Sequence, residues 1–245
     1  MNFLFPAKIP PTTELVLGER RVTIEVRKSA RARSFRLTVP HHGAPVLTIP
    51  AGGKWPEAQG FLKRHAGWLE TRLARATPST AFADGEVIPV AGVPHRIHAT
   101  GRLRGRVERG EIDGEAVLLV PGEAAHLPRR LTEWLKAEAH AALTARSAVH
   151  AETLGVTVVS ITMRSQSTRW GSCSSSGRLN YNWRLILAPP FVLDYVAAHE
   201  VAHLVHMNHS QSFWRTVARA MPDMESGRAW LKAHGKVLMG YGLGA

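Results

Sequence analysis

Cysteine is nearly absent from this sequence, which excludes several ways of stabilising a fold. The 245 residues include one cysteine, Cys173. A single thiol forms no intramolecular disulfide and supplies no all-cysteine zinc site. A chain without disulfides fits a reducing compartment, so we expect a cytoplasmic protein.

Long hydrophobic runs are also missing. The N-terminal segment Met1–Pro6 lacks an apolar run of signal-peptide length. No other segment approaches the ~18 uninterrupted apolar residues that a membrane span requires. The sequence therefore predicts no targeting segment and no membrane partner.

Acidic residues are few compared with basic ones. The 31 lysines and arginines outnumber the 19 aspartates and glutamates, which gives a formal net charge of +12 at pH 7. Such a charge attracts anionic partners or substrates. The composition is otherwise ordinary, with 44% hydrophobic and 20% charged residues. These values exclude a wholly disordered, collagen-like or coiled-coil chain.

Hydrophobic periodicity predicts an α+β fold in two parts, residues 1–125 and 126–245. The first part is β-rich. It has strands near 22–26, 35–39 and 46–49 in a small antiparallel meander, one helix over 55–75, and short strands near 87–90, 96–98, 104–107 and 117–120. The second part has a helix over 128–154, two strands of one sheet over 156–163 and 178–187, and helices over 191–207, 211–221 and 224–239.

The segment His199-Glu200-Val201-Ala202-His203 carries the chemistry. It forms an H-E-x-x-H pattern inside an otherwise apolar helix. At 3.6 residues per turn, the two imidazoles stack on one face and can reach one zinc ion. Glu200 lies about 100° around the helix, where it can act as general base toward a water on the metal. The pattern therefore predicts a metal-dependent hydrolase.

A tetrahedral catalytic zinc site needs a third protein ligand. His209 follows His203 by six residues, and Asn208 could adopt the left-handed conformation that turns the chain back toward the metal. Glu225, from the following helix, and His206, on the same helix face, are the alternatives. We favour His209.

Four short motifs together resemble one protein family. They are Arg169–Cys173 (R-W-G-S-C), Asn182–Leu185 (N-W-R-L), His199–His203, and Asn208–Trp214 (N-H-S-x-x-F-W). They resemble the YgjP-like metallopeptidases, which are distantly similar to SprT-like zinc proteases. The resemblance implies a zincin-like catalytic half over residues 126–245, with the H-E-x-x-H helix packed on a small sheet. It also implies one zinc ion per chain on His199, His203 and His209, with Glu200 as general base.

Other residues are candidates for supporting roles. Arg169, Tyr195 and His234 could stabilise an oxyanion, and the sequence does not rank them. If the strand over 179–183 edges the cleft, an extended peptide could pair with it. Cys173 could instead be a thiol nucleophile, although a reduced structural cysteine fits better beside a complete metal motif.

Three functions are compatible with these features. The first is a zinc-dependent metallopeptidase acting on a peptide or protein. The second is a metal-dependent hydrolase of nucleotide phosphoanhydrides, which the basic charge would suit. The third is a DNA-associated protease whose basic N-terminal region binds nucleic acid, although the arginines there also fit a solvated face without stacking aromatics.

Overall fold

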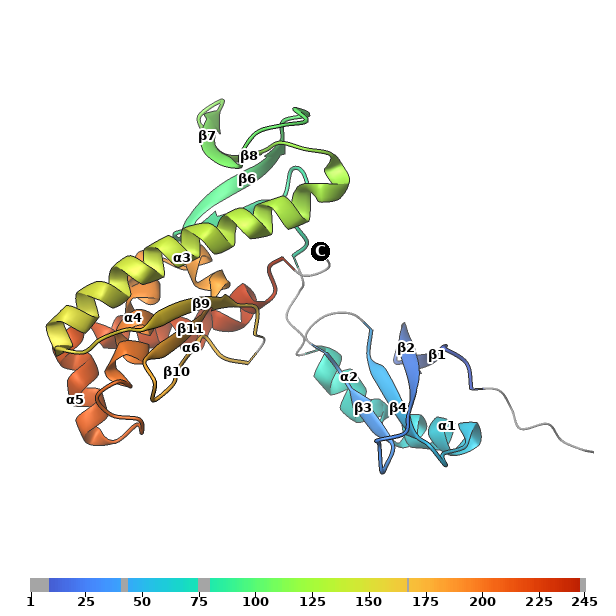
Figure 1. The fold of residues 1–245 in the computed structure, drawn as a ribbon. Coiled ribbons are helices and arrows are strands. Elements are labelled where there is room, and N and C mark those ends of the chain that lie inside the picture. The colour runs from blue at the N-terminus through green and yellow to red at the C-terminus, as the bar shows by residue number, and fades with distance from the viewer. Residues whose placement is uncertain (1–8, 41–43, 75–79, 167, 243–245) are drawn as a thin grey trace, which may run out of the picture. The chain divides into compact units, whose positions relative to one another are not determined.

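A computed structural model describes residues 9–40, 44–74, 80–166 and 168–242, and its fold class is α+β as predicted (Figure 1). The chain divides into two compact units, one ending at residue 78 and one beginning at residue 79. Within the described residues, no helix combines the length and the apolar character needed to cross a membrane.

The first unit packs two helices and one sheet around its own core. Its elements are β1 (Thr12–Leu17), β2 (Arg20–Ser29), β3 (Arg36–Thr38), β4 (Val46–Pro50), α1 (Trp55–Arg64) and α2 (Ala66–Ala74). The strand order is β1-β2-β4-β3, and β2 runs parallel to β4. The predicted antiparallel meander is therefore wrong. The most buried strands, which carry Ile24 and Leu47, lie side by side, and the short, more exposed β3 takes the edge. The single predicted helix is interrupted at His65.

The second unit begins with a four-stranded sheet in the order β5-β6-β8-β7. Its strands are β5 (Val87–Val90), β6 (Val93–Ala99), β7 (Glu108–Ile112) and β8 (Glu115–Val120). The predicted strand over 104–107 is wrong. Gly105 has a φ of 139° there, and regular pairing begins only at Glu108. Apolar residues of this sheet share one core with the following helix, and the compact unit that contains both begins at residue 79.

The remaining elements form a three-stranded sheet and the helices that follow or pack against it. They are η1 (Ala124–His126), α3 (Leu127–Leu154), β9 (Ser160–Arg164), β10 (Gly171–Cys173), β11 (Arg178–Asn182), η2 (Trp183–Leu187), α4 (Pro190–Ala202), α5 (Gln211–Ala220) and α6 (Met224–Met239). The two predicted strands pair in parallel as β9 and β11, each shorter than predicted. Because β11 lies between β10 and β9, both of its edges are occupied. The hypothesis that a peptide pairs with the strand over 179–183 is therefore wrong.

Candidate metal centre

Helix α4 holds the first two histidines of the motif. Pro190 occupies the first helical turn, where its missing N–H costs nothing. The helix is buried along most of its length and packs against α3, α5, α6 and β10. His199 lies in its last full turn and His203 at its C-terminal cap. A packed helix thus fixes both imidazoles one turn apart.

The turn after α4 brings the third histidine back. Asn208 is not among the described residues with positive φ, so the predicted left-handed turn at this position is wrong. Instead, the Asn208 side-chain oxygen accepts a hydrogen bond from the Ser210 backbone N–H at 3.3 Å. The Ser210 hydroxyl in turn caps α5 by accepting from the Phe213 N–H at 3.4 Å. These two side-chain contacts order the turn that carries His209.

His199, His203 and His209 each offer a ligand nitrogen, and the three nitrogens lie within 4.8 Å of one another. The Nε2 atoms of His199 and His209 are 3.1 Å apart. His203 uses Nδ1 to contact the His206 carbonyl oxygen at 3.0 Å, which leaves Nε2 for a metal. Glu225 does not join this group, since its carboxylate pairs with Arg228 at 3.1 Å.

The surroundings of His199 and His203 favour the neutral imidazole, the form in which histidine binds a metal. Burial, with smaller contributions from His203, His209 and Arg228, lowers the pKa of His199 to about 3. Burial also lowers the pKa of His203. Phe213 is fully buried, and its ring centroid lies 4.5–4.9 Å from those of the three histidines. Three converging imidazoles are a donor set that fits zinc.

Glu200 lies against the short strand β10 and is 5% exposed. A Cβ atom at Gly171 would come within 2.6 Å of Cγ and Cδ of Glu200. Only glycine therefore fits at position 171 with the carboxylate where it is. Burial raises the pKa of Glu200 to about 8, against the opposing effect of the positive charge of Arg169.

A cavity of about 280 Å³ opens beside this carboxylate. Its lining residues are Trp170, Gly171, Tyr195, Val196, His199, Glu200, Arg228 and Leu231. Of the three predicted oxyanion candidates, Tyr195 lines the cavity. Arg169 is exposed and affects Glu200 through its charge. His234 is exposed, packs on Trp230 with ring centroids 4.8 Å apart, and is not part of the lining.

Arg228 is a cavity residue that the sequence did not indicate. Its guanidinium lies 4.7 Å from the ring centroid of Trp214, and Trp214 stacks on His209 with centroids 5.8 Å apart. Arg228 is separated from the H-E-x-x-H motif by a whole helix, α5. No local spacing could therefore have connected it with the histidines.

The loop before β10 is held by a buried asparagine. The Asn182 side-chain amide donates to the Gln166 carbonyl oxygen at 2.6 Å, and its backbone N–H donates to Trp170 O at 2.8 Å. In β10 itself, burial and the charge of Glu200 raise the pKa of Cys173 to about 11. A thiol that stays protonated is a poor nucleophile, so the alternative of a cysteine hydrolase gains no support.

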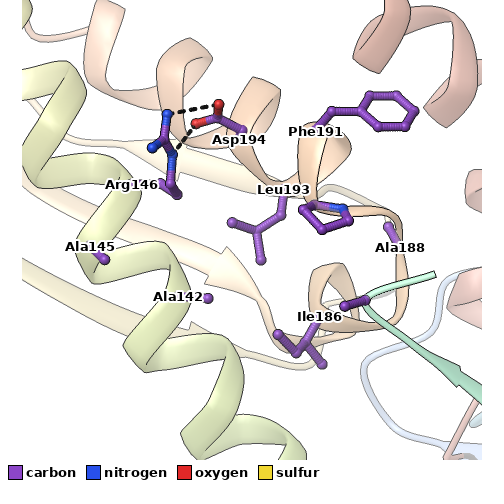
Figure 2. A pocket seen from close by; sticks show the side chains of 10 residues that line it. Ala142, Ala145, Arg146, Ile186, Ala188, Phe191, Leu193 and Asp194 are labelled. Atoms are coloured by element: carbon purple, nitrogen blue, oxygen red, sulfur yellow. Dashed lines mark hydrogen bonds and ion pairs between the residues drawn. The ribbon is translucent and has the colours of Figure 1, made fainter. Parts of the chain in front are cut away.

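An ion-pair network holds α4 against α3 (Figure 2). Arg146 on α3 donates from Nε and Nη2 to the two carboxylate oxygens of Asp194 on α4, at 2.6 and 2.9 Å. The buried His150 contacts the same carboxylate at 2.6 Å through Nε2. Burial alone would raise the pKa of Asp194, but these two partners lower it overall. A cavity of about 460 Å³ lies beside this pair, and none of the predicted site residues lines it.

Comparison with known proteins gives two similarities. A family profile described as "YgjP-like, metallopeptidase domain" matches residues 33–234. Among solved structures, the metallopeptidase zymogen abylysin of Pyrococcus abyssi matches with 20% identity and a TM-score of 0.35, over 39% of this chain and 94% of that one. No curated protein gives a significant match.

Proposed function

This chain belongs to the YgjP-like metallopeptidase family, and from that premise we propose that it is a zinc-dependent peptidase with zinc on His199, His203 and His209. The family implies a metal and a peptide or protein substrate. The observation that carries the proposal is the convergence of three ring nitrogens beside the buried carboxylate of Glu200. We further propose that residues 126–245 form a zincin-like catalytic part, in which α4 packs against β10.

In this proposal the metal supplies Lewis acidity, which makes a water molecule nucleophilic near neutral pH. Glu200 is the general base: a carboxylate oxygen takes a proton from the attacking water and returns it to the leaving amine nitrogen. Burial favours the protonated carboxyl, whereas a cation held by the three histidines favours the carboxylate that the first step needs. The buried position against Gly171 restricts where that carboxylate can lie.

Tyr195 is our proposed donor to the developing oxyanion. It lines the cavity with Glu200, and its ring centroid lies 5.9 Å from that of His199. Burial raises the pKa of Tyr195, so its hydroxyl stays protonated and able to donate at neutral pH. Arg169 and His234 are outside the lining and are less suited to this role.

The two alternative functions, hydrolysis of a nucleotide and proteolysis associated with DNA, gain no support from these findings. Among the described residues that line the cavity, only Arg228 carries a positive charge. A nucleoside triphosphate would bring several negative charges into this cavity. Sites that bind such a ligand usually supply several positive charges, and this lining supplies one. The family match supports neither a nucleotide nor a nucleic-acid partner.

Metal analysis tests the proposed ligands. We expect purified wild type to hold about one zinc per chain, with His203→Ala and His209→Ala each losing it because two imidazoles bind zinc weakly. His206→Ala and Glu225→Ala are matched controls from the same region and should retain the metal. Folded wild-type protein that binds no added zinc would overturn the proposal.

A second experiment tests the reaction. Wild type should hydrolyse casein, and Glu200→Gln should keep its zinc but lose at least about 100-fold in rate, the usual contribution of a general base. The same two proteins are assayed in parallel with nucleoside triphosphates. Hydrolysis of the nucleotide alone would reject the peptidase assignment.

A further inference from the structure

The sheet formed by β5 to β8 has one face toward the core and one face away from it. Ile97 of β6 and Leu118 of β8 are register partners, are fully buried, and belong to the core that α3 completes. The neighbouring row across three strands consists of His98, Leu119 and Glu108. Because side chains alternate along a strand, this row lies on the face opposite α3.

The connection from β6 to β7 borders this outer face and encloses a hollow of about 270 Å³. The lining residues are His98, Thr100, Arg102, Arg104, Gly105, Arg106, Glu108, Leu119 and Pro121. Three of them are arginines and one is a glutamate, so the lining carries a formal charge of +2 with the histidine neutral. No ion pair involves any of the three arginines within the described residues.

The backbone of this connection is tied to the rest of the unit. The Gly122 N–H donates to the Arg102 carbonyl oxygen at 2.7 Å, and the Arg102 N–H donates to the Thr100 hydroxyl at 3.3 Å. Arg130 on α3 donates from Nη2 to the Gly105 carbonyl oxygen at 2.6 Å. The three arginines thus project from a segment whose path is fixed, while their guanidinium groups stay available.

We propose that this hollow binds a phosphoryl group, either free phosphate or a phosphate monoester. A phosphate monoester carries about −1.5 to −2 at neutral pH, which complements the formal charge of the lining. Guanidinium groups match phosphate oxygens with paired N–H donors, and the Thr100 hydroxyl can add another donor. The lining contains no phenylalanine, tyrosine or tryptophan on which a base could stack, so a small phosphorylated ligand fits better than a nucleic-acid strand. The site is separate from the proposed peptidase centre and does not depend on it.

Calorimetric titration of the zinc-loaded protein with inorganic phosphate, at constant ionic strength set with chloride, tests the proposal. We expect saturable binding of one phosphate per chain. Arg104→Gln and Arg106→Gln should each weaken it about tenfold, because each removes a charged hydrogen-bonding partner. Neither side chain makes a hydrogen bond to another described residue, so the fold does not depend on them, and a thermal melt of each variant checks this.

The matched control is Arg129→Gln. Arg129 is also an exposed arginine of the second unit, but it pairs with Glu133 at 2.9 Å and does not line the hollow. Arg129→Gln should leave phosphate affinity within about twofold of wild type, since it lowers the net charge by one and removes only an exposed ion pair away from the hollow. O-phosphoserine, with serine as its control, shows whether the phosphate is bound free or carried on an organic group.

Three results would overturn the proposal. The first is the absence of saturable phosphate binding. The second is binding that Arg104→Gln and Arg106→Gln leave unchanged, which would locate the phosphate elsewhere, including at the zinc. The third is an oligothymidylate that binds more tightly than either phosphate ligand through the same arginines, which would make the surface a polynucleotide site.

Discussion

Replacing Gly171 with alanine should disable Glu200 while leaving the metal in place. The added Cβ would lie 2.6 Å from Cγ and Cδ of Glu200 and closer still to Oε1. Carbon atoms in contact are normally about 3.5 Å apart, so the carboxylate must retreat by about 1 Å. A misplacement of that size costs on the order of 100-fold in rate, or about 2.7 kcal/mol of transition-state stabilisation. Gly171 does not have positive φ, so the backbone itself accepts alanine.

The assay compares casein hydrolysis, zinc content and thermal unfolding of Gly171→Ala with those of wild type. Gly67→Ala is the matched control, because no heavy atom lies within 4 Å of the Cβ that it would add. We expect wild-type zinc content in both variants and a rate loss in Gly171→Ala alone. A Gly171→Ala protein with wild-type kcat/KM would refute the reasoning, since the carboxylate would then tolerate the displacement.

The grouping of the histidines follows from local sequence, whereas the rest of the site does not. His199 and His203 are one helical turn apart, and His209 returns through a short turn, so spacing alone could predict that all three lie together. Gly171 and Arg228 reach the same cavity from β10 and α6. Their positions depend on how β10 and α6 pack against α4. The number of residues between them and the histidines does not reveal that packing.

Apolar periodicity predicted most elements but not their neighbours. Three predicted helices are confirmed within about one residue at each end, namely those over 128–154, 211–221 and 224–239. In each of them apolar residues recur every three or four positions, which is the spacing of a helix with one buried face. Strand alternation indicates which face is buried but not which strand lies beside it. For this reason the sequence did not predict that β2 and β4 of the first sheet pair in parallel, and the antiparallel meander was wrong.

Three further predictions concern stability and pH. Asp194→Asn should lower the unfolding free energy by about 1–3 kcal/mol, because the buried His150 and the half-exposed Arg146 lose their carboxylate. The lowered pKa of Asp194 makes this contribution present above pH ~4 and lost below it, so the melting temperatures of variant and wild type should converge in acid. Gly227→Ala should cost about 1–3 kcal/mol in chemical denaturation, because its Cβ would overlap side-chain atoms of α4. In metal-free protein, Glu200 keeps its proton up to about pH 8 when folded but loses it near pH 4.5 when unfolded. The folded state therefore binds more protons between these values, and its stability falls as pH rises through them. Metal-free Glu200→Gln has no carboxyl to titrate, so its unfolding free energy should not fall in this way. At pH 8 it should exceed that of metal-free wild type by a few kcal/mol, and at pH 5 the difference between the two proteins should be smaller. Parallel stability curves for the two proteins across that range would contradict the raised pKa and the burial that causes it.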